Sequence, residues 1–364
     1  MNTWKPSINR TQTASQSESV ARGLNLADAR KAIQNQDYEQ AIRIFETILK
    51  NDPQSATAWL GLASVHFRRN EFDTARTSVQ SALDLDPMSA RAHLLLGFID
   101  IKREALDEAE QSFQTALDID PRQHRALTGL ARCYLKKQDW PRAEAKLLQA
   151  IKYNPQLVNL RLFLARLYRK IGQKEKASTV LKSTEVIAPR NVAVKVLHAQ
   201  LLYKENDLNG ALAMCQEAVK LDENNVQSNL LLGRISLKLH NHEQAQRAYK
   251  RVIEQKPRTA FAYLRLAESL IADEKYDEAL EFLNDLPSTK RSKYMMHKLR
   301  GDIYYRQNHY QACVEEYRAA LLQMHKEQNI LEKMEEEAFA EDENWEEIAE
   351  ALKTGIENSL SEED

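Results

Sequence analysis

The 364-residue sequence has few of the residues that interrupt helices or cross-link chains. Glycine and proline occur only 9 times each, so long helices are allowed almost everywhere. The 3 cysteines are odd in number and far apart, which argues against a disulfide framework and favours a reducing compartment, with the cytoplasm as the expected location. No apolar run approaches the roughly 18 residues that cross a bilayer, so we expect no membrane span.

The sequence also lacks the motifs GxGxxG, GxxxxGKS/T, HExxH, GxSxG and CxxC. His240 and His242 flank Asn241 beside Glu243, but they fall in a predicted turn between helices, and we expect no metal site there. The cysteines occupy packing positions, where they act as small hydrophobic residues rather than as nucleophiles: Cys133, Cys215 and Cys313. We therefore expect a protein that is not an enzyme and needs no cofactor.

A period of 34 residues runs through most of the chain. A helix does not easily continue through proline, so the prolines at this interval mark helix ends, with Glu223 in the one skipped position: Pro53, Pro87, Pro121, Pro155, Pro189 and Pro257. Small residues recur at two further positions of every unit. One of these series is Ala29, Ala63, Gly97, Ala131, Ala165, Ala199, Gly233, Ala267 and Gly301. Small residues at fixed positions predict two helix backbones that approach closely.

Larger apolar residues occupy the complementary positions, three or four apart, as on one face of a helix. Together these patterns resemble the tetratricopeptide repeat family, whose 34-residue pattern runs W…LG…Y…A…F…A…P. One unit carries much of that pattern: Trp59, Leu62, Ala63, Ala75, Val79, Ala82 and Pro87. The resemblance implies an all-α fold, a right-handed α-solenoid of about nine tandem helix-turn-helix units with a C-terminal capping helix.

We divide the chain accordingly into three segments. Residues 1–21 are polar and are predicted to be disordered, residues 22–327 hold the repeats, and residues 328–364 form an acidic tail. The repeat units are expected to start near residues 22, 56, 90, 124, 158, 192, 226, 260 and 294. Two departures from the pattern predict irregularities: Asp28 replaces the usual leucine of the first unit, and Pro287 should shorten a helix of the eighth by about one turn.

The charge is divided unevenly along the chain. Residues 328–364 carry 14 Asp and Glu and 2 Lys and Arg, a net charge of −12, whereas the whole chain carries −2, so residues 1–327 carry +10. In the tail, Trp345, Ile348 and Leu352 follow helical spacing between glutamates, which predicts an amphipathic acidic helix. A basic repeat array is thus joined to an acidic tail.

In the tetratricopeptide repeat family the first helix of each unit lines the concave side, and this resemblance predicts a basic groove with aromatic residues. The candidate partner-binding residues are Arg91, Phe98, Lys102, Arg125, Arg132, Lys136, Arg166, Lys170, Tyr203, Arg234 and Lys238. Such a groove favours acidic peptides, because guanidinium groups bind carboxylates through paired hydrogen bonds. The lysines among them are equally compatible with simple solvation at a helix end.

The leading functional hypothesis is a non-enzymatic scaffold or adaptor that binds an acidic peptide or a partner helix in this groove. Its own tail, through Trp345, Ile348 and Leu352, is a candidate for docking in the groove and competing with the partner. The tail as a solvated segment, or as a helix bound by another protein, remains open. Alternatives for the whole chain are a structural subunit of a larger complex and a nucleic-acid-associated protein, the latter disfavoured because the basic residues are spread thinly over the repeats.

Overall fold

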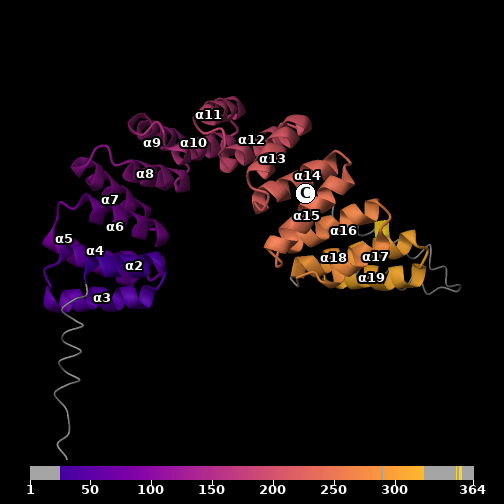
Figure 1. Cartoon of the computed structure of the whole chain (residues 1–364), viewed down its shortest axis with the longest axis horizontal. Helices are drawn as coiled ribbons and strands as arrows, with labels where there is room; N and C mark the ends of the chain where they lie inside the picture. The colour runs from indigo at the N-terminus through magenta and orange to yellow at the C-terminus, as the bar shows by residue number, and fades with distance from the viewer. Residues whose placement is uncertain (1–24, 288–289, 324–349, 351, 355–364) are drawn as a thin grey trace, which may run out of the picture. The chain divides into compact units, whose positions relative to one another are not determined.

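The computed structural model describes residues 25–287, 290–323, 350 and 352–354. These residues form eighteen labelled α-helices and no β-strand, which confirms the predicted all-α fold (Figure 1). The polar segment predicted over residues 1–21 lies outside the described part, as does most of the acidic tail. Among the described residues no helix is both long enough and apolar enough to span a membrane.

The chain divides into two compact units, one running to Gln173 and the other beginning at Lys174. The first unit contains α2 (Leu26–Gln34), α3 (Tyr38–Asn51), α4 (Ala56–Arg68), α5 (Phe72–Leu85), α6 (Ala90–Lys102), α7 (Leu106–Ile119), α8 (His124–Lys136), α9 (Trp140–Tyr153) and α10 (Val158–Lys170). The second contains α11 (Lys174–Ile187), α12 (Val192–Lys204), α13 (Leu208–Leu221), α14 (Val226–Lys238), α15 (His242–Gln255), α16 (Ala260–Ala272), α17 (Tyr276–Asn284), α18 (Lys290–Arg306) and α19 (Tyr310–Gln323).

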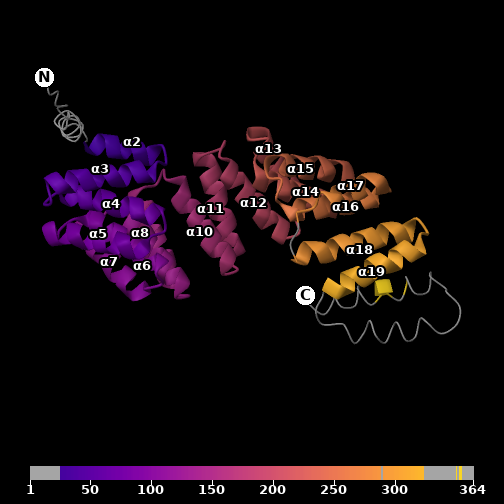
Figure 2. The same ribbon diagram turned by 90° about the horizontal axis from the view of Figure 1, so that it is seen from below.

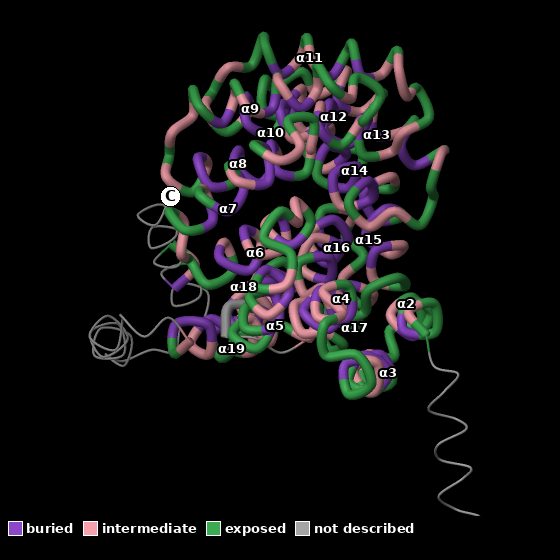
Figure 3. Tube along the Cα trace, turned by 90° about the vertical axis from the view of Figure 1, so that its left-hand side faces the viewer, coloured by how far each residue is buried: buried purple, intermediate pink, exposed green. Residues whose placement is uncertain are grey.

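Within each unit the helices stack as antiparallel pairs. We call the even-numbered helices A helices and the odd-numbered ones B helices. Most B helices pack between the A helices that flank them, as α5 does between α4 and α6, and some successive A helices also contact each other, as α6 and α8 or α12 and α14 do. Figure 3 shows buried and exposed stretches alternating along the helices, as expected when each helix buries one face.

The turn from A helix to B helix has the same geometry throughout the described chain. One residue in each of these turns adopts a left-handed φ, between 55° and 78°: Gln36, Asn70, Glu104, Gln138, Gly172, Asn206, His240, Glu274 and Asn308. The amide three residues beyond the last helical residue donates back across the helix end, as Glu71 does to the main-chain oxygen of His66 at 3.0 Å. This is the Schellman motif, which satisfies the last carbonyl groups of a helix. Repetition of this one turn keeps the period constant.

The small residues of the A helices lie against large residues of the B helices. A Cβ atom added at Gly97 would lie 2.7 Å from the Phe113 ring, and one added at Gly129 would lie 2.4 Å from the same ring. In the same way, a Cβ atom added at Gly233 would lie 2.6 Å from the Tyr249 ring, and one added at Gly301 would lie 2.3 Å from the Tyr317 ring. Glycine is needed here because an aromatic ring fills the space that a Cβ would take.

The two departures from the repeat pattern fall on the two shortest of the described helices, α2 and α17. Pro287 follows α17, which has 9 residues where the other B helices have 14, so the helix is shortened as predicted. The first A helix, α2, also has 9 residues, and Asp28 closes a capping box at its start: the Asn25 side chain accepts from the Asp28 amide, and the Asp28 side chain accepts from the Asn25 amide at 3.2 Å. Asp28, at a position where the repeat pattern has leucine, therefore stabilises the N-terminus of α2.

Candidate peptide-binding surface

The exposed side chains of the A helices form a surface that we call the A-helix face. The candidate residues on α6, α8 and α10 belong to the first unit, and those on α12 and α14 belong to the second. Every arginine and lysine among them is exposed, whereas Phe98 and Tyr203 are half-buried. The face is therefore accessible and charged, with aromatic rings set between the cations.

In the first unit the A-helix face contains a hollow of about 350 Å³. Four arginines line it, two of them among the predicted residues: Arg30, Arg68, Arg91 and Arg125. Leu60, Leu94 and Phe98 contribute apolar surface. No acidic residue lines the hollow, and within the described part of the chain none of the four arginines forms an ion pair. Four cations around an apolar hollow repel one another, and an anionic ligand would relieve that repulsion.

Aromatic rings hold several of the predicted cations in place. In the first unit the guanidinium of Arg125 lies 5.9 Å from the centre of the Phe98 ring, and the Lys170 ammonium lies 5.0 Å from that of Trp140. Arg132 is similarly placed over Phe163, at 5.9 Å. Such cation–π contacts orient a charged group while leaving it exposed. The sequence pattern missed Trp140, which lies at the start of the B helix α9.

Other candidates in the first unit stand apart from the hollow. Lys102 and Arg166 are exposed and do not line it. Lys136 lies 3.9 Å from the carboxylate of Glu104, and both groups are exposed. An exposed pair at this distance contributes little to stability. The structure therefore brings Arg91, Phe98 and Arg125 into one hollow but does not gather every predicted residue.

In the second unit Tyr203 carries two cations. The Arg234 guanidinium lies 5.2 Å and the Lys238 ammonium 4.7 Å from the centre of its ring. At the position of Arg234 in the next two A helices stand Glu268 and Asp302, which line a second hollow, of about 490 Å³, on α16 and α18.

One predicted tail residue is described at a definite place. Leu352 is 2% exposed and packs on the last helix pair, among Tyr294, Val314, Tyr317 and other buried residues of α18 and α19. Figure 2 shows this short segment, in yellow, beside α19. The neighbouring Lys353 lies 4.6 Å from the centre of the Tyr305 ring. Leu352 thus covers the apolar end of the last pair. Trp345 and Ile348 lie outside the described residues.

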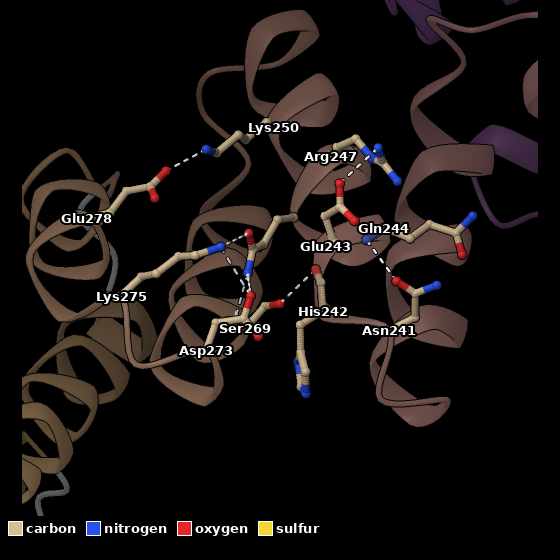
Figure 4. Close-up of polar contacts among 11 residues, drawn as sticks. Asn241, His242, Glu243, Gln244, Arg247, Lys250, Ser269, Asp273, Lys275 and Glu278 are labelled. Carbon is tan, nitrogen blue, oxygen red and sulfur yellow. Dashed lines mark hydrogen bonds and ion pairs between the residues drawn. The ribbon is translucent and has the colours of Figure 1, made fainter.

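His242 sits in a polar network of structural character (Figure 4). The ring of His242 points away from Glu243, and Ser269 donates from its hydroxyl to the main-chain oxygen of His242 at 3.2 Å. Nearby, the buried Gln246 side chain donates to Asp273 at 2.8 Å, which joins α15 to α16. Among the described residues no group of three histidine, cysteine or acidic side chains is arranged to hold a metal ion.

These features define a helical-repeat protein with a charged A-helix face. Residues 32–98 and 100–156 match the family model described as tetratricopeptide repeat, and residues 204–340 match the one described as tetratricopeptide repeat-like domain. The chain belongs to the tetratricopeptide repeat family. No curated protein matches its sequence.

Solved structures of other repeat proteins resemble the chain at low identity. PilF of Pseudomonas aeruginosa is 20% identical, with 60% of this chain and 97% of that one covered and a TM-score of 0.48. The C-terminal part of a TPR repeat-containing protein from Cytophaga hutchinsonii is 16% identical, covering 66% and 99%, with a TM-score of 0.49. Human IFIT1, solved as a dimer with m7Gppp-AAAA, is 15% identical, covering 92% and 86%, also with a TM-score of 0.49.

Proposed function

We propose that the chain is a non-enzymatic scaffold that binds an acidic segment of a partner protein on its A-helix face. Tetratricopeptide repeats are in general protein–protein interaction modules, and the hollow of the first unit supports the more specific proposal. Four exposed arginines, which form no ion pair within the described part of the chain, surround apolar surface from Leu60, Leu94 and Phe98. A peptide with one large apolar residue between acidic residues matches this arrangement in both charge and polarity.

A fluorescein-labelled Glu-Glu-Leu-Glu-Glu peptide, followed by fluorescence anisotropy, tests the proposal. We expect the triple change Arg68→Gln, Arg91→Gln and Arg125→Gln to weaken binding at least tenfold, since each charge-assisted hydrogen bond contributes about 1.5–3 kcal/mol. The matched control is Lys50→Gln, Arg122→Gln and Lys152→Gln, which removes the same charge from exposed positions outside the A helices. Equal weakening in both triple variants would show only a general charge effect and would contradict the proposal.

The acidic tail is proposed to modulate this binding by competing for the arginines. Deleting the tail is a poor test because Leu352 covers the last helix pair. Neutralising its acidic residues while keeping Leu352 is cleaner, through changes to Gln or Asn at Glu341, Asp342, Glu343, Glu346 and Glu347. Tighter peptide binding by this variant supports modulation, and unchanged affinity excludes it.

The proposed compartment is the cytoplasm. All three cysteines are buried and unpaired, as expected in a reducing environment: Cys133, Cys215 and Cys313. A single-stranded RNA titrated beside the acidic peptide separates the two kinds of partner, because binding to RNA would depend steeply on salt and would not require an apolar residue. The scaffold proposal expects the peptide to bind and the RNA not to bind at physiological salt.

A further inference from the structure

Two tyrosines occupy the same position in the helix pairs α14–α15 and α18–α19. Tyr249 and Tyr317 are fully buried, and each ring lies against a glycine of its A helix, Gly233 or Gly301. In each case the tyrosine follows the glycine by sixteen residues. The two rings therefore sit in equivalent pockets of the second unit, and the polar ends of the two side chains can be compared directly.

The two hydroxyl groups differ in their partners. Tyr317 donates to Oδ1 of Asp302, the residue after Gly301, at 2.8 Å. The residue after Gly233 is Arg234, whose guanidinium has no acceptor atom. Within the described part of the chain the Tyr249 hydroxyl is buried and has no hydrogen-bond partner. A buried hydroxyl without a partner costs free energy, so an acceptor supplied from outside would be stabilised there.

The surroundings of the Tyr249 hydroxyl are mainly cationic. Arg234 is exposed and lies over the Tyr203 ring at 5.2 Å, and Lys238 lies over the same ring at 4.7 Å. Arg265 approaches from α16 and is paired with Glu268 at 2.6 Å. Among the charged groups that act on Tyr249, two arginines, Arg234 and Arg265, face one carboxylate, that of Glu268, so the local charge favours an incoming anion. The exposed Arg234 side chain can turn away from the Tyr203 ring to meet such an anion.

We propose that Tyr249 and Arg234 form a binding site for a carboxylate of the partner, an Asp or Glu side chain. The partner carboxylate takes the place that the Asp302 carboxylate holds in the last helix pair. It accepts a hydrogen bond from the Tyr249 hydroxyl and pairs with Arg234. The inference rests on the proposed function for the acidic partner, and it adds a site in the second unit that is separate from the four-arginine hollow.

Hexaglutamate is the probe, with hexaglutamine as its uncharged control, and the full-length protein is labelled with ¹³C in its tyrosine rings. The Tyr249 signal is identified by its loss in Tyr249→Phe, a change that the fold accepts because Phe45 and Phe113 occupy the same position in other helix pairs. We expect hexaglutamate, but not hexaglutamine, to shift this signal saturably. A Tyr249 signal that stays in place throughout the titration overturns the inference.

Three variants sharpen the test. Tyr249→Phe should weaken the hexaglutamate site in the second unit about tenfold without lowering thermal stability, whereas Tyr317→Phe, whose hydroxyl already has an internal acceptor, should leave binding unchanged. Arg234→Asp recreates the Asp302–Tyr317 pair, so it should raise thermal stability and abolish the Tyr249 shift. A shift that survives Arg234→Asp, or equal affinities for the wild type and Tyr249→Phe, contradicts the site.

The outcome also separates this inference from the proposed function. In one outcome, anisotropy shows that hexaglutamate binds and that the triple arginine variant of the first unit weakens this binding, but the Tyr249 signal does not shift. This outcome excludes the second-unit site and leaves the scaffold proposal intact. Hexaglutamate that binds to neither unit contradicts both.

Discussion

Arg76 on α5 donates from Nε to Oδ1 of Asp100 on α6, at 3.2 Å, across the contact between two successive helix pairs. In the next helix pairs a hydrogen bond again joins these two positions, 24 residues apart, but the later residue in the sequence is now the donor. Tyr134 donates to Glu110 at 2.8 Å. This polar contact therefore repeats along the first unit with different residues, and Asp100 is its most deeply buried member, at 1% exposure.

Replacing Asp100 with leucine should stabilise the first unit at neutral pH. Burial raises the pKa of Asp100 above its usual 3.8, although Arg76 and Arg103 oppose the shift, and among the described residues one of its carboxylate oxygens has no hydrogen-bond partner. Leucine is acceptable because Leu202 and Leu270 occupy the same position in other A helices. We expect Asp100→Leu to raise the free energy of unfolding at pH 7 by about 1 kcal/mol, measured by urea denaturation.

The sign of the pH dependence follows from the raised pKa. Folded protein holds the Asp100 proton more tightly than unfolded protein does, so this group favours folding below pH 3.8 and loses that contribution as the pH rises through its folded-state pKa. The advantage of Asp100→Leu should therefore shrink from pH 7 toward pH 4. The control is Glu110→Leu. Burial alone would raise the pKa of Glu110, but hydrogen bonds from Lys137 and Tyr134 outweigh burial, so the pKa is lowered. Because the folded protein thus stabilises the Glu110 carboxylate, this change should destabilise the protein at pH 7. The same effect in both variants would contradict the assignment.

The glycine at position 97 is matched to its aromatic neighbour. A Cβ there would lie 2.7 Å from the Phe113 ring, so Gly97→Ala should cost about 1–3 kcal/mol by overpacking. In most other pairs the alanine at this position is followed sixteen residues later by a residue that is not aromatic, as Ala131 is by Leu147, whereas Ala29 is followed by Phe45. The double variant Gly97→Ala, Phe113→Leu should therefore recover part of the loss. Thermal denaturation measures the coupling, and strictly additive effects would show that the two residues do not share one space.

Ala143 provides a second test of close helix packing. It is fully buried on α9, in the series of small residues that the period predicts. Ala143→Leu should destabilise the first unit by about 1–3 kcal/mol, because the added carbons have no space between the helices. The matched control is Ala145→Leu, the same change at an exposed position of the same helix, and urea denaturation of both variants gives the comparison. A neutral Ala143→Leu would mean that the helices do not pack closely there.

The three cysteines should be unreactive in the native protein. Burial raises the pKa of Cys133 to about 11 and those of Cys215 and Cys313 to about 12. At pH 8 the thiolate that attacks Ellman's reagent is therefore a small fraction of each thiol. We expect no rapid reaction with native protein and three thiols per chain after denaturation. Rapid reaction of a native thiol would show that one of these helix pairs opens.

Leu352 should stabilise the last helix pair and leave the first unit unaffected. Its side chain is 2% exposed against α18 and α19, so Leu352→Ala should cost about 2–4 kcal/mol locally. Amide hydrogen exchange is expected to increase in α18 and α19 and to stay unchanged over residues 25–173. Thr354→Ala, at an exposed neighbouring position, is the control. Unchanged exchange in α18 and α19 would show that Leu352 is not a structural cap.

The sequence alone determined the helical repeat of this protein. Pro287 predicted the shortened α17, and the recurring alanines and glycines predicted close helix pairs, because helix ends and backbone separation depend on local residue types. A further signal was present but missed: glycine accompanies an aromatic residue sixteen positions later in Gly97 and Phe113, and again in Gly233 and Tyr249. That correlation already specifies which rings fill the space beside the A helices.

Only the tertiary structure determined which polar groups lie close together in space. The period puts Arg91 and Arg125 on equivalent positions, but their meeting with Arg30 and Arg68 around one hollow depends on how successive helices pack. The missing partner of the Tyr249 hydroxyl likewise appears only in three dimensions, since it depends on what lies across from a buried atom. Period and helix ends are properties of neighbouring residues along the chain, whereas burial and electrostatic environment are properties of residues that folding brings together.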